Sequence, residues 1–384
     1  MLEPLAAAHL PEGLRARHIN HVNGLRMHVL EAGVAGRPLL LLLHGFPELA
    51  YSWRNIMRPL AELGYHVVAP DQRGYGRTEG PVPVYDEDLT PYRPLGYVRD
   101  ALALVAALGH TEVACVIGHD FGAPVAGNAA LTRPDVFRSV VMMSAPYGGP
   151  RAWPLGEQGA PEALAGLASP ALHEALARLN PPRRHYQWFY STREADADMH
   201  HAPQGLHAFL RAYYHHKSAD WAANKPYPLG SFTAEALAVM PTYYIMPAGI
   251  GMAETVAAEM PDAATIAANT WLPEAAMAVY AEEYGRTGFQ GGLQSYRCTT
   301  SGQAAAEMRL FAGRGIEVPA CFIAGASDWG IHQKPGEFEL MQGQGCRDLR
   351  GLHLVQGAGH WVQQEQAGQV AGLIRDFLHR LGKA

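Results

Sequence analysis

One segment, residues 113–131, restricts the fold of this chain more than any other. It begins with a short apolar run at 113–117, which is typical of a buried parallel strand. Residues 118–122 follow with the order Gly-His-Asp-Phe-Gly, and an alanine-rich segment of helical character comes directly after them. Glycines two residues before and after Asp120 permit a sharp turn, because a Cβ at either position would collide with neighbouring backbone. The segment therefore predicts a strand, a tight turn with Asp120 at its apex, and a helix.

The rest of the chain alternates between further strand and helix patterns. Two strands joined at Asn23-Gly24 form a strong hairpin signal, and the five leucines at 39–43 indicate a strand covered on both faces. This alternation predicts an α/β fold with a mostly parallel sheet and helices on both faces. Besides 39–43 and 113–117, strands are expected at 15–22, 25–31, 65–69, 139–144, 318–324 and 352–355, and helices at 52–63, 97–108 and 365–381.

Between the two groups of strands the pattern changes. From residue 148 to about 301 the sequence shows no clear buried strand, is rich in Ala, His, Tyr and Trp, and has helical patches interrupted by prolines. We interpret this region as a helical cap inserted into the α/β core. The predicted domains are a core formed by residues 1–147 and 302–384 and a cap at 148–301.

The charge, the hydropathy and the cysteine content limit which binding partners and which cellular compartment we expect. The formal net charge is −6 and the sequence pI is about 6.3, so a nucleic-acid partner is not expected. The N-terminus lacks a signal-peptide pattern, and no apolar run approaches the ~20 residues that a membrane span needs. Four widely spaced cysteines without a Cys-x-x-Cys pair favour a reducing, cytoplasmic setting. These are Cys115, Cys298, Cys321 and Cys346.

Three residues that can share one reaction follow predicted strands in a meaningful order. Asp120, Asp328 and His360 each come directly after one of the strands named above. Open α/β sheets place their sites at the carboxyl ends of strands, and nucleophile, acid and histidine follow one another in this order in nucleophile-elbow hydrolases. Taken singly, Asp328 also suits a helix N-cap and His360 a surface loop. Together the three residues favour a catalytic triad.

A carboxylate at the apex determines the type of reaction. The elbow motif Gly-x-Ser-x-Gly has serine where Asp120 stands. A carboxylate is ionised at neutral pH and can attack an sp³ carbon without a base, which gives an ester. His360, oriented by Asp328, can then activate a water that attacks the ester carbonyl. The backbone N–H groups of Phe46 and Phe121 are expected to stabilise the resulting oxyanion.

Two leaving groups fit such a displacement, and they need different helpers. The alkoxide from an epoxide is strongly basic and needs O–H donors, for which tyrosine is suited because it stays protonated at pH 7. A halide needs only N–H donors such as Trp or Asn. The residues alone leave both reactions open at this point.

Three motifs resemble those of the epoxide hydrolases with the α/β-hydrolase fold. Residues 44–48 (His-Gly-Phe-Pro-Glu) resemble the family's oxyanion-hole motif, residues 118–124 its nucleophile motif, and residues 359–361 (Gly-His-Trp) its histidine motif. The resemblance implies a cis Phe46–Pro47 bond. It also implies a set of residues that line or support the substrate pocket, namely His44, Gly45, Pro47, Glu48, His119, Trp188 and Trp361.

The resemblance extends to two cap tyrosines. Residues 186–190 (Tyr-Gln-Trp-Phe-Tyr) are similar to the family's first tyrosine motif and residues 294–297 to its second, which assigns the two ring-oxygen donors to Tyr186 and Tyr296. Phe121 and Phe46 stand where haloalkane dehalogenases keep Trp and often Asn, and both departures weaken the dehalogenase interpretation. Other cap tyrosines compete with Tyr186 and Tyr296 for the donor role or pack as buried aromatics: Tyr190, Tyr213, Tyr214, Tyr243 and Tyr244.

Three further features have modest interpretations. Glu48 could position the hydrolytic water or could be a helix-start carboxylate. The loop at 71–78 lacks phosphate-loop spacing, and we expect it to be structural. A group of cap histidines lacks a complete ligand pattern, so no metal site and no cofactor are expected. This group is His200, His201, His207, His215 and His216.

The sequence thus predicts a hydrolase that opens small-molecule epoxides with water to vicinal diols, a detoxifying reaction. The alternatives are a haloalkane dehalogenase with the same Asp120 nucleophile and a ligand-binding protein that kept the fold without turnover. No membrane partner is expected, and a homodimer is kept open as the assembly.

Overall fold

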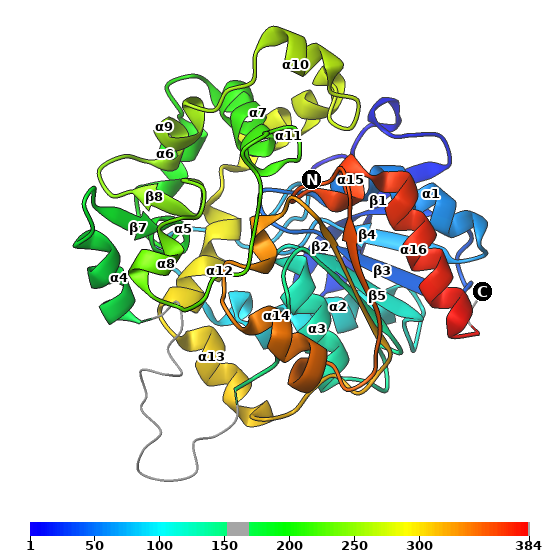
Figure 1. Cartoon of the computed structure of the whole chain (residues 1–384). Helices are drawn as coiled ribbons and strands as arrows, with labels where there is room; N and C mark the ends of the chain where they lie inside the picture. The colour runs from blue at the N-terminus through cyan, green and yellow to red at the C-terminus, as the bar shows by residue number, and fades with distance from the viewer. Residues whose placement is uncertain (152–168, 383–384) are drawn as a thin grey trace.

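The computed structural model describes residues 1–151 and 169–382 and contains an eight-stranded sheet (Figure 1). In this sheet β3, β4, β5, β6, β9 and β10 run parallel to one another, whereas β2 is antiparallel to both β1 and β4. The α/β fold with a mostly parallel sheet is therefore confirmed. In spatial order the strands are β1 (Leu14–Val22), β2 (Leu25–Ala32), β4 (His66–Pro70), β3 (Leu39–Leu43), β5 (Cys115–His119), β6 (Val140–Met143), β9 (Ala320–Gly325) and β10 (Leu349–Val355).

The hairpin at the start of the chain has the turn that its sequence predicts. Asn23 and Gly24 both have positive φ values, 48° and 82°. This is the backbone of a type I′ turn, which Asn-Gly adopts readily and whose twist matches that of the flanking strands. The turn fixes the register of β1 on β2, which adds an antiparallel edge to the sheet.

The central strands are buried on both faces, as the leucine run at 39–43 predicts. Even-numbered leucines of β3 lie in one apolar cluster with α1 (Arg54–Glu62) and α16 (Ala367–Arg380). Odd-numbered leucines of β3 lie in a second cluster with α2 (Pro94–Ala107) and α3 (Gly122–Thr132). Because successive side chains of a strand point to opposite faces, one five-residue run supplies both layers of the core.

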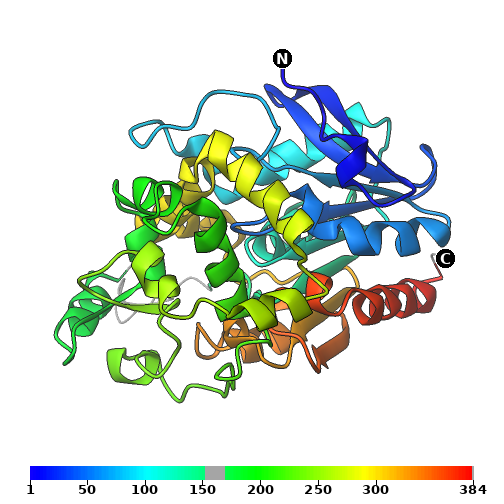
Figure 2. The same cartoon turned by 90° about the horizontal axis from the view of Figure 1, so that it is seen from above.

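A group of cap helices gathers at one end of the sheet, as Figures 1 and 2 show. The predicted cap begins at residue 148, and residues 152–168 lie outside the described residues. The domain boundaries themselves remain a prediction. The helices are α4 (Pro170–Ala177), α5 (Tyr186–Tyr190), α6 (Ala195–His200), α7 (Leu206–Lys217), α8 (Ala234–Leu237), α9 (Met252–Ala257), α10 (Ala263–Ala268), α11 (Glu274–Thr287) and α12 (Gln290–Thr300).

The expectation of an insertion without strands is wrong in one detail. β7 (Arg183–His185) pairs antiparallel with β8 (Ile245–Pro247) and forms a small second sheet. Strands of three residues are too short to show an alternating pattern in the sequence, so only the pairing of distant segments reveals them. β7 leads directly into α5 and thereby fixes the start of that helix at Tyr186. In the described ranges, no helix combines the length and the hydropathy needed to cross a membrane.

Two glycine substitutions should separate the turn geometry from ordinary helix propensity. An added Cβ at Gly122 would lie 2.1 Å from the carbonyl oxygen of Leu43, whereas at Gly372 in α16 its nearest contact is a side-chain nitrogen at 3.9 Å. We expect Gly372→Ala to raise the free energy of unfolding by about 0.5–1 kcal/mol. Gly122→Ala should lower it by several kcal/mol or prevent folding. Urea unfolding followed by circular dichroism measures both, and equal effects would contradict the steric argument.

Candidate active site

The turn after β5 holds Asp120 in a constrained backbone. Asp120 has a φ of 50°, a conformation that non-glycine residues seldom adopt. A Cβ at Gly118 would lie 2.0 Å from the carbonyl oxygen of Gly122, and a Cβ at Gly45 would lie 2.5 Å from Asp120 Oδ1. The predicted strand, turn and helix are thus present, with Asp120 at the apex.

The three residues of the predicted triad lie in hydrogen-bond contact. His360 Nε2 is 3.1 Å from Asp120 Oδ2, and His360 Nδ1 is 3.1 and 3.2 Å from the two carboxylate oxygens of Asp328. Asp328 also accepts from the backbone N–H of Gly330 at 2.6 Å and so caps a short 3₁₀ helix. The N-cap and triad interpretations of Asp328 therefore both describe real contacts, and the first of them orients the carboxylate for the second.

The pKa values in this cluster follow from burial and mutual charge. Burial alone would raise the pKa of Asp120, but the hydrogen bond and charge of His360 outweigh it and hold that pKa well below its ordinary value. For His360, burial and the nearby Lys217 lower the pKa, while the Asp328 and Asp120 carboxylates raise it and prevail. Asp120 is consequently an ionised carboxylate at neutral pH, as a nucleophile must be.

The predicted oxyanion loop contacts Asp120 directly. The backbone N–H of Phe46 donates to Asp120 Oδ1 at 2.9 Å, and the Phe46–Pro47 bond is cis, as the resemblance implies. Phe121 immediately precedes α3, so its N–H belongs to the groups that a helix start leaves without an intrahelical partner. Its side chain lines the same cavity as Asp120. The Phe46 N–H therefore contacts the carboxylate, and the Phe121 N–H remains a predicted donor.

Glu48 and His119 form a buried pair behind the nucleophile. Glu48 Oε2 lies 2.5 Å from His119 Nδ1 and accepts from the backbone N–H of Gly45 at 3.0 Å. His119 Nε2 donates to the carbonyl oxygen of His360 at 2.7 Å. Burial raises the pKa of Glu48, and the charge of His119 outweighs it and lowers that pKa. The pair thus connects the loop at residues 44–48, the end of β5 and the loop that holds His360.

The other oxygen of Glu48 accepts from the side chains of Gln363 and Gln364, at 2.8 and 3.2 Å. Within the described part of the chain, the recorded partners of Glu48 include no backbone N–H of a helix start. The contacts therefore favour a positioning role for Glu48 over the helix-start alternative.

Most of the remaining motif residues make hydrogen bonds close to the site, whereas Trp188 packs against another part of the cap. His44 Nε2 accepts from the backbone N–H of Gln72, and Trp361 Nε1 donates to the carbonyl oxygen of Tyr214. The Pro47 carbonyl oxygen accepts from the Tyr214 hydroxyl. Trp188, expected near the pocket, instead stacks on His173 with ring centroids 4.4 Å apart. Residues two apart on a helix face different ways, so Trp188 turns away from the side on which Tyr186 lies.

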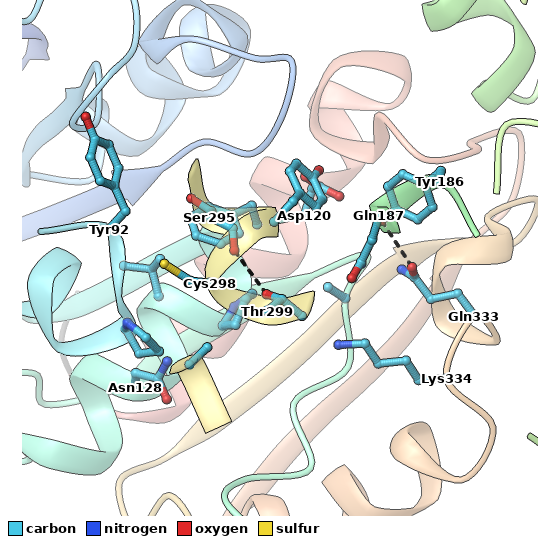
Figure 3. Close-up of a pocket in the computed structure, with 17 residues that line it drawn as sticks. Tyr92, Asp120, Asn128, Tyr186, Gln187, Ser295, Cys298, Thr299, Gln333 and Lys334 are labelled. Atoms are coloured by element: carbon cyan, nitrogen blue, oxygen red, sulfur yellow. Dashed lines mark hydrogen bonds between the residues drawn. The ribbon is translucent and has the colours of Figure 1, made fainter. Parts of the chain in front are cut away.

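A cavity of about 180 Å³ contains Asp120 and both predicted tyrosines (Figure 3). The ring centroids of Tyr186 and Tyr296 are 5.8 Å apart. Burial, followed by neighbouring charges that include Asp120, raises the pKa of both phenols well above 10. Both therefore keep their protons at neutral pH and can donate hydrogen bonds into the cavity.

The competing tyrosines have other surroundings. Tyr190 donates to the Tyr213 hydroxyl, Tyr214 to Pro47 and Tyr243 to Asn224. The residues that line the cavity include Tyr186 and Tyr296 but none of the competing cap tyrosines. Placement therefore supports the pair assigned by the resemblance.

Lys217 is a buried residue near the site that no motif in the sequence predicts. Its side chain is 3% exposed, and its Nζ lies 5.2–5.8 Å from the ring centroids of Tyr213, Tyr243, Tyr244 and Trp361. It sits at the end of α7, and its carbonyl oxygen accepts from the N–H of His360 at 2.9 Å. No spacing signal marks this lysine, because the rings around it come from separate segments.

Glu365 is a second residue near His360 that no motif in the sequence predicts. Its carboxylate accepts from three backbone N–H groups, those of Gly359 and Trp361 on either side of His360 and that of Ala219 after α7. Burial, opposed by these bonds, raises the pKa of Glu365 to about 8. Glu365 therefore ties the histidine loop to the end of a cap helix.

The loop at 71–78 and the cap histidines make contacts that hold the fold together. Asp71 accepts from the backbone N–H groups of Ala50 and Arg77, which supports the structural interpretation of the loop at 71–78. Among the cap histidines, His207 pairs with Glu274 and His216 packs against Trp221. In residues 1–151 and 169–382, no group of three His, Cys, Asp or Glu side chains could hold a metal ion.

Comparison with known proteins agrees with this site. A family model described as alpha/beta hydrolase fold matches residues 38–367. Epoxide hydrolase A of Mycobacterium tuberculosis is 30% identical over 369 residues, and epoxide hydrolase B of that species is 32% identical over 376 residues. Each alignment covers 95% of this chain and 98% of the relative.

Solved structures give the same result. An epoxide hydrolase from an endophytic Streptomyces has a TM-score of 0.75 at 30% identity, covering 97% of this chain and 98% of the other. Potato (Solanum tuberosum) epoxide hydrolase I has a TM-score of 0.72 at 29% identity, covering 96% and 99%. The chain therefore belongs to the α/β-hydrolase fold family and, within it, to the epoxide hydrolases.

Proposed function

We propose that this enzyme opens an epoxide to a vicinal diol through an ester on Asp120, which water activated by His360 then hydrolyses. The observation that carries the proposal is one cavity in which an ionised carboxylate and two protonated phenols face each other. The carboxylate can form the bond to carbon, and the phenols can receive the negative charge that the ring oxygen acquires.

In the first step Asp120 attacks a ring carbon and the carbon–oxygen bond of the epoxide breaks. The bonding electrons go to the ring oxygen, which takes a proton from Tyr186 or Tyr296. Without a substrate, the Tyr186 hydroxyl donates to Gln333 Oε1 at 3.3 Å, a long hydrogen bond. Binding of the epoxide therefore requires this proton to turn toward the ring oxygen.

In the second step water attacks the carbonyl carbon of the ester and His360 takes its proton. Ester formation removes the negative charge of Asp120, which is one of the two carboxylates that raise the His360 pKa. The His360 pKa therefore falls in the intermediate, so that the imidazole is neutral and able to accept a proton when a base is needed. Phe46 and Phe121 supply backbone N–H groups near the oxyanion. Its collapse breaks the bond between the carboxyl carbon and the substrate oxygen, which takes the proton from His360 and leaves as the diol. The Asp120 carboxyl group formed in this way gives its proton to the tyrosinate of the first step, which restores both residues.

The alternatives have less support. Phe46 and Phe121 provide no side-chain N–H for a halide, whereas two phenols suit an alkoxide. A ligand-binding protein without turnover would not need a complete relay from Asp328 through His360 to Asp120.

We retain the core at 1–147 and 302–384, the cap at 148–301, the cytoplasmic setting, the detoxifying role and the homodimer as predictions.

The ester should be visible when its hydrolysis is blocked. In His360→Gln, incubation with styrene oxide is expected to increase the intact mass by one substrate mass, because the epoxide adds without losing an atom. Asp120→Ala should show no turnover, and the double variant should show no adduct. Electrospray mass spectrometry of the whole chain measures this, and an adduct that persists in the double variant would place the nucleophile elsewhere.

The two cavity tyrosines should act in ester formation. Single Tyr186→Phe and Tyr296→Phe variants are expected to slow this step, and the double variant to slow it by on the order of 10²–10⁴-fold, since no acid remains for the alkoxide. Rapid-quench measurement under single-turnover conditions follows the ester. Tyr243→Phe removes a buried cap hydroxyl outside the cavity and should leave the rate unchanged; an equal loss there would refute the assignment.

The fall of activity at low pH, the acid limb of the pH–activity profile, should reflect protonation of His360. Ester hydrolysis needs a neutral His360, so activity is lost as pH falls through the His360 pKa in the ester intermediate, where Asp328 still raises that pKa and the charge of Asp120 is gone. Asp328→Asn removes a carboxylate that raises this pKa, so the limb should move to lower pH while turnover falls by on the order of 10²–10⁴-fold. Asp348→Asn removes an exposed carboxylate paired with Arg350 and should leave the limb in place. An unmoved limb in Asp328→Asn would contradict the assignment.

A further inference from the structure

A buried glutamine beside Tyr186 presents an unsatisfied acceptor near the cavity. Gln187 is 7% exposed, lines the cavity that contains Asp120, and donates from Nε2 to the Tyr186 hydroxyl at 3.1 Å. Its Oε1 is buried and has no hydrogen-bond partner in the described part of the chain. Figure 3 shows Gln187 entering the cavity from the side opposite Tyr92 and Cys298.

The orientation of this carboxamide follows from its neighbours. The Gly330 carbonyl oxygen can only accept, so Gln333 turns Nε2 toward it, at 3.3 Å, and turns Oε1 toward Tyr186. Tyr186 then donates to Gln333, and its oxygen accepts from Nε2 of Gln187. Gln187 Oε1 is thereby turned away from Tyr186. The hydrogen-bond network therefore fixes which atom of Gln187 is left for a ligand.

With a purely apolar substrate the buried carbonyl oxygen of Gln187 stays without a hydrogen-bond partner, which is unfavourable for a buried acceptor. An O–H group on the substrate would satisfy it. Charged groups fit less well: a carboxylate would face the Gln187 oxygen, and an ammonium would face Lys334, which enters the cavity from the same side (Figure 3). A neutral donor is the chemistry that both residues accept.

We propose that the substrates of this enzyme are epoxides that carry a hydroxyl group within a few bonds of the ring, with Gln187 Oε1 as its acceptor. The short distance along the substrate follows because both polar atoms of Gln187 belong to one carboxamide, and the nitrogen already contacts the Tyr186 hydroxyl. The apolar side chains in the cavity lining, which include Pro94, Val125 and Ala304, take the hydrocarbon part. The inference rests on the proposed epoxide hydrolysis and specifies its substrate class.

The test compares 2,3-epoxyhexan-1-ol with its methyl ether, which keeps the electron-withdrawing oxygen but lacks the donor. In the unmodified enzyme, kcat/KM for the alcohol is expected to exceed that for the ether by about tenfold, the effect of one neutral hydrogen bond. In Gln187→Met, which keeps the length of the side chain, the ratio should fall to about one. Loss of the N–H that Gln187 gives Tyr186 slows both substrates alike and cancels in the ratio.

Two further variants complete the design. Thr299→Val changes a cavity residue whose hydroxyl already donates within α12, so the ratio should stay at about ten. Gln187→Asn withdraws the acceptor by one methylene, should also lower the ratio, and replaces Gln187→Met if that variant does not fold.

The outcomes separate the inference from the proposed function. Equal kcat/KM for both epoxides in the unmodified enzyme, or a tenfold ratio that survives in the Gln187 variants, would overturn the inference and leave epoxide hydrolysis intact. Failure to convert either epoxide, together with no ester in His360→Gln, would overturn the proposed function itself.

Discussion

The site depends on the close approach of three backbone segments around Asp120. Gly45 and Gly118 leave room that any side chain would fill, and Asp120 occupies a φ of 50° between them. This geometry brings the carboxylate within 2.9 Å of the Phe46 N–H and within 3.1 Å of His360. Asp120, in the first third of the chain, thus meets the end of β3 and the loop after β10, because parallel strands end at one edge of the sheet.

Charge balance is the second constraint, and both core and cap supply it. Asp120 and Asp328 are buried carboxylates that share His360, and Lys217 adds a buried positive charge among aromatic rings of the cap and Trp361. The cap therefore sets the electrostatics of the triad as well as covering it. Formation of an ester on Asp120 would remove one negative charge from this set, which makes the order of the two proposed steps electrostatically consistent.

A chain of hydrogen bonds joins polar groups of the cap and the core beside the cavity. Gly330, beside the acid Asp328, orients Gln333, which orients Tyr186 and through it Gln187. One network thereby orients both the proposed proton donor for the ring oxygen and the proposed acceptor for the substrate. In such a network each member restricts the next, so the selectivity of the cavity is linked to the geometry of the triad.

The amino-acid sequence was enough to predict the sheet, the turn at Asp120 and the order of the three proposed triad residues, and its motifs pointed to Tyr186 and Tyr296. These signals are local: strand periodicity, glycines at fixed spacing and short motifs. It missed β7 and β8 and misplaced Trp188. It gave no sign of Lys217, Glu365 or the free oxygen of Gln187, because each gains its role from partners far away in the chain. Which polar atoms are paired, and that Gln187 Oε1 is among the buried atoms of the described residues without a partner, became visible only in the folded chain, because hydrogen bonds join segments that are distant in sequence.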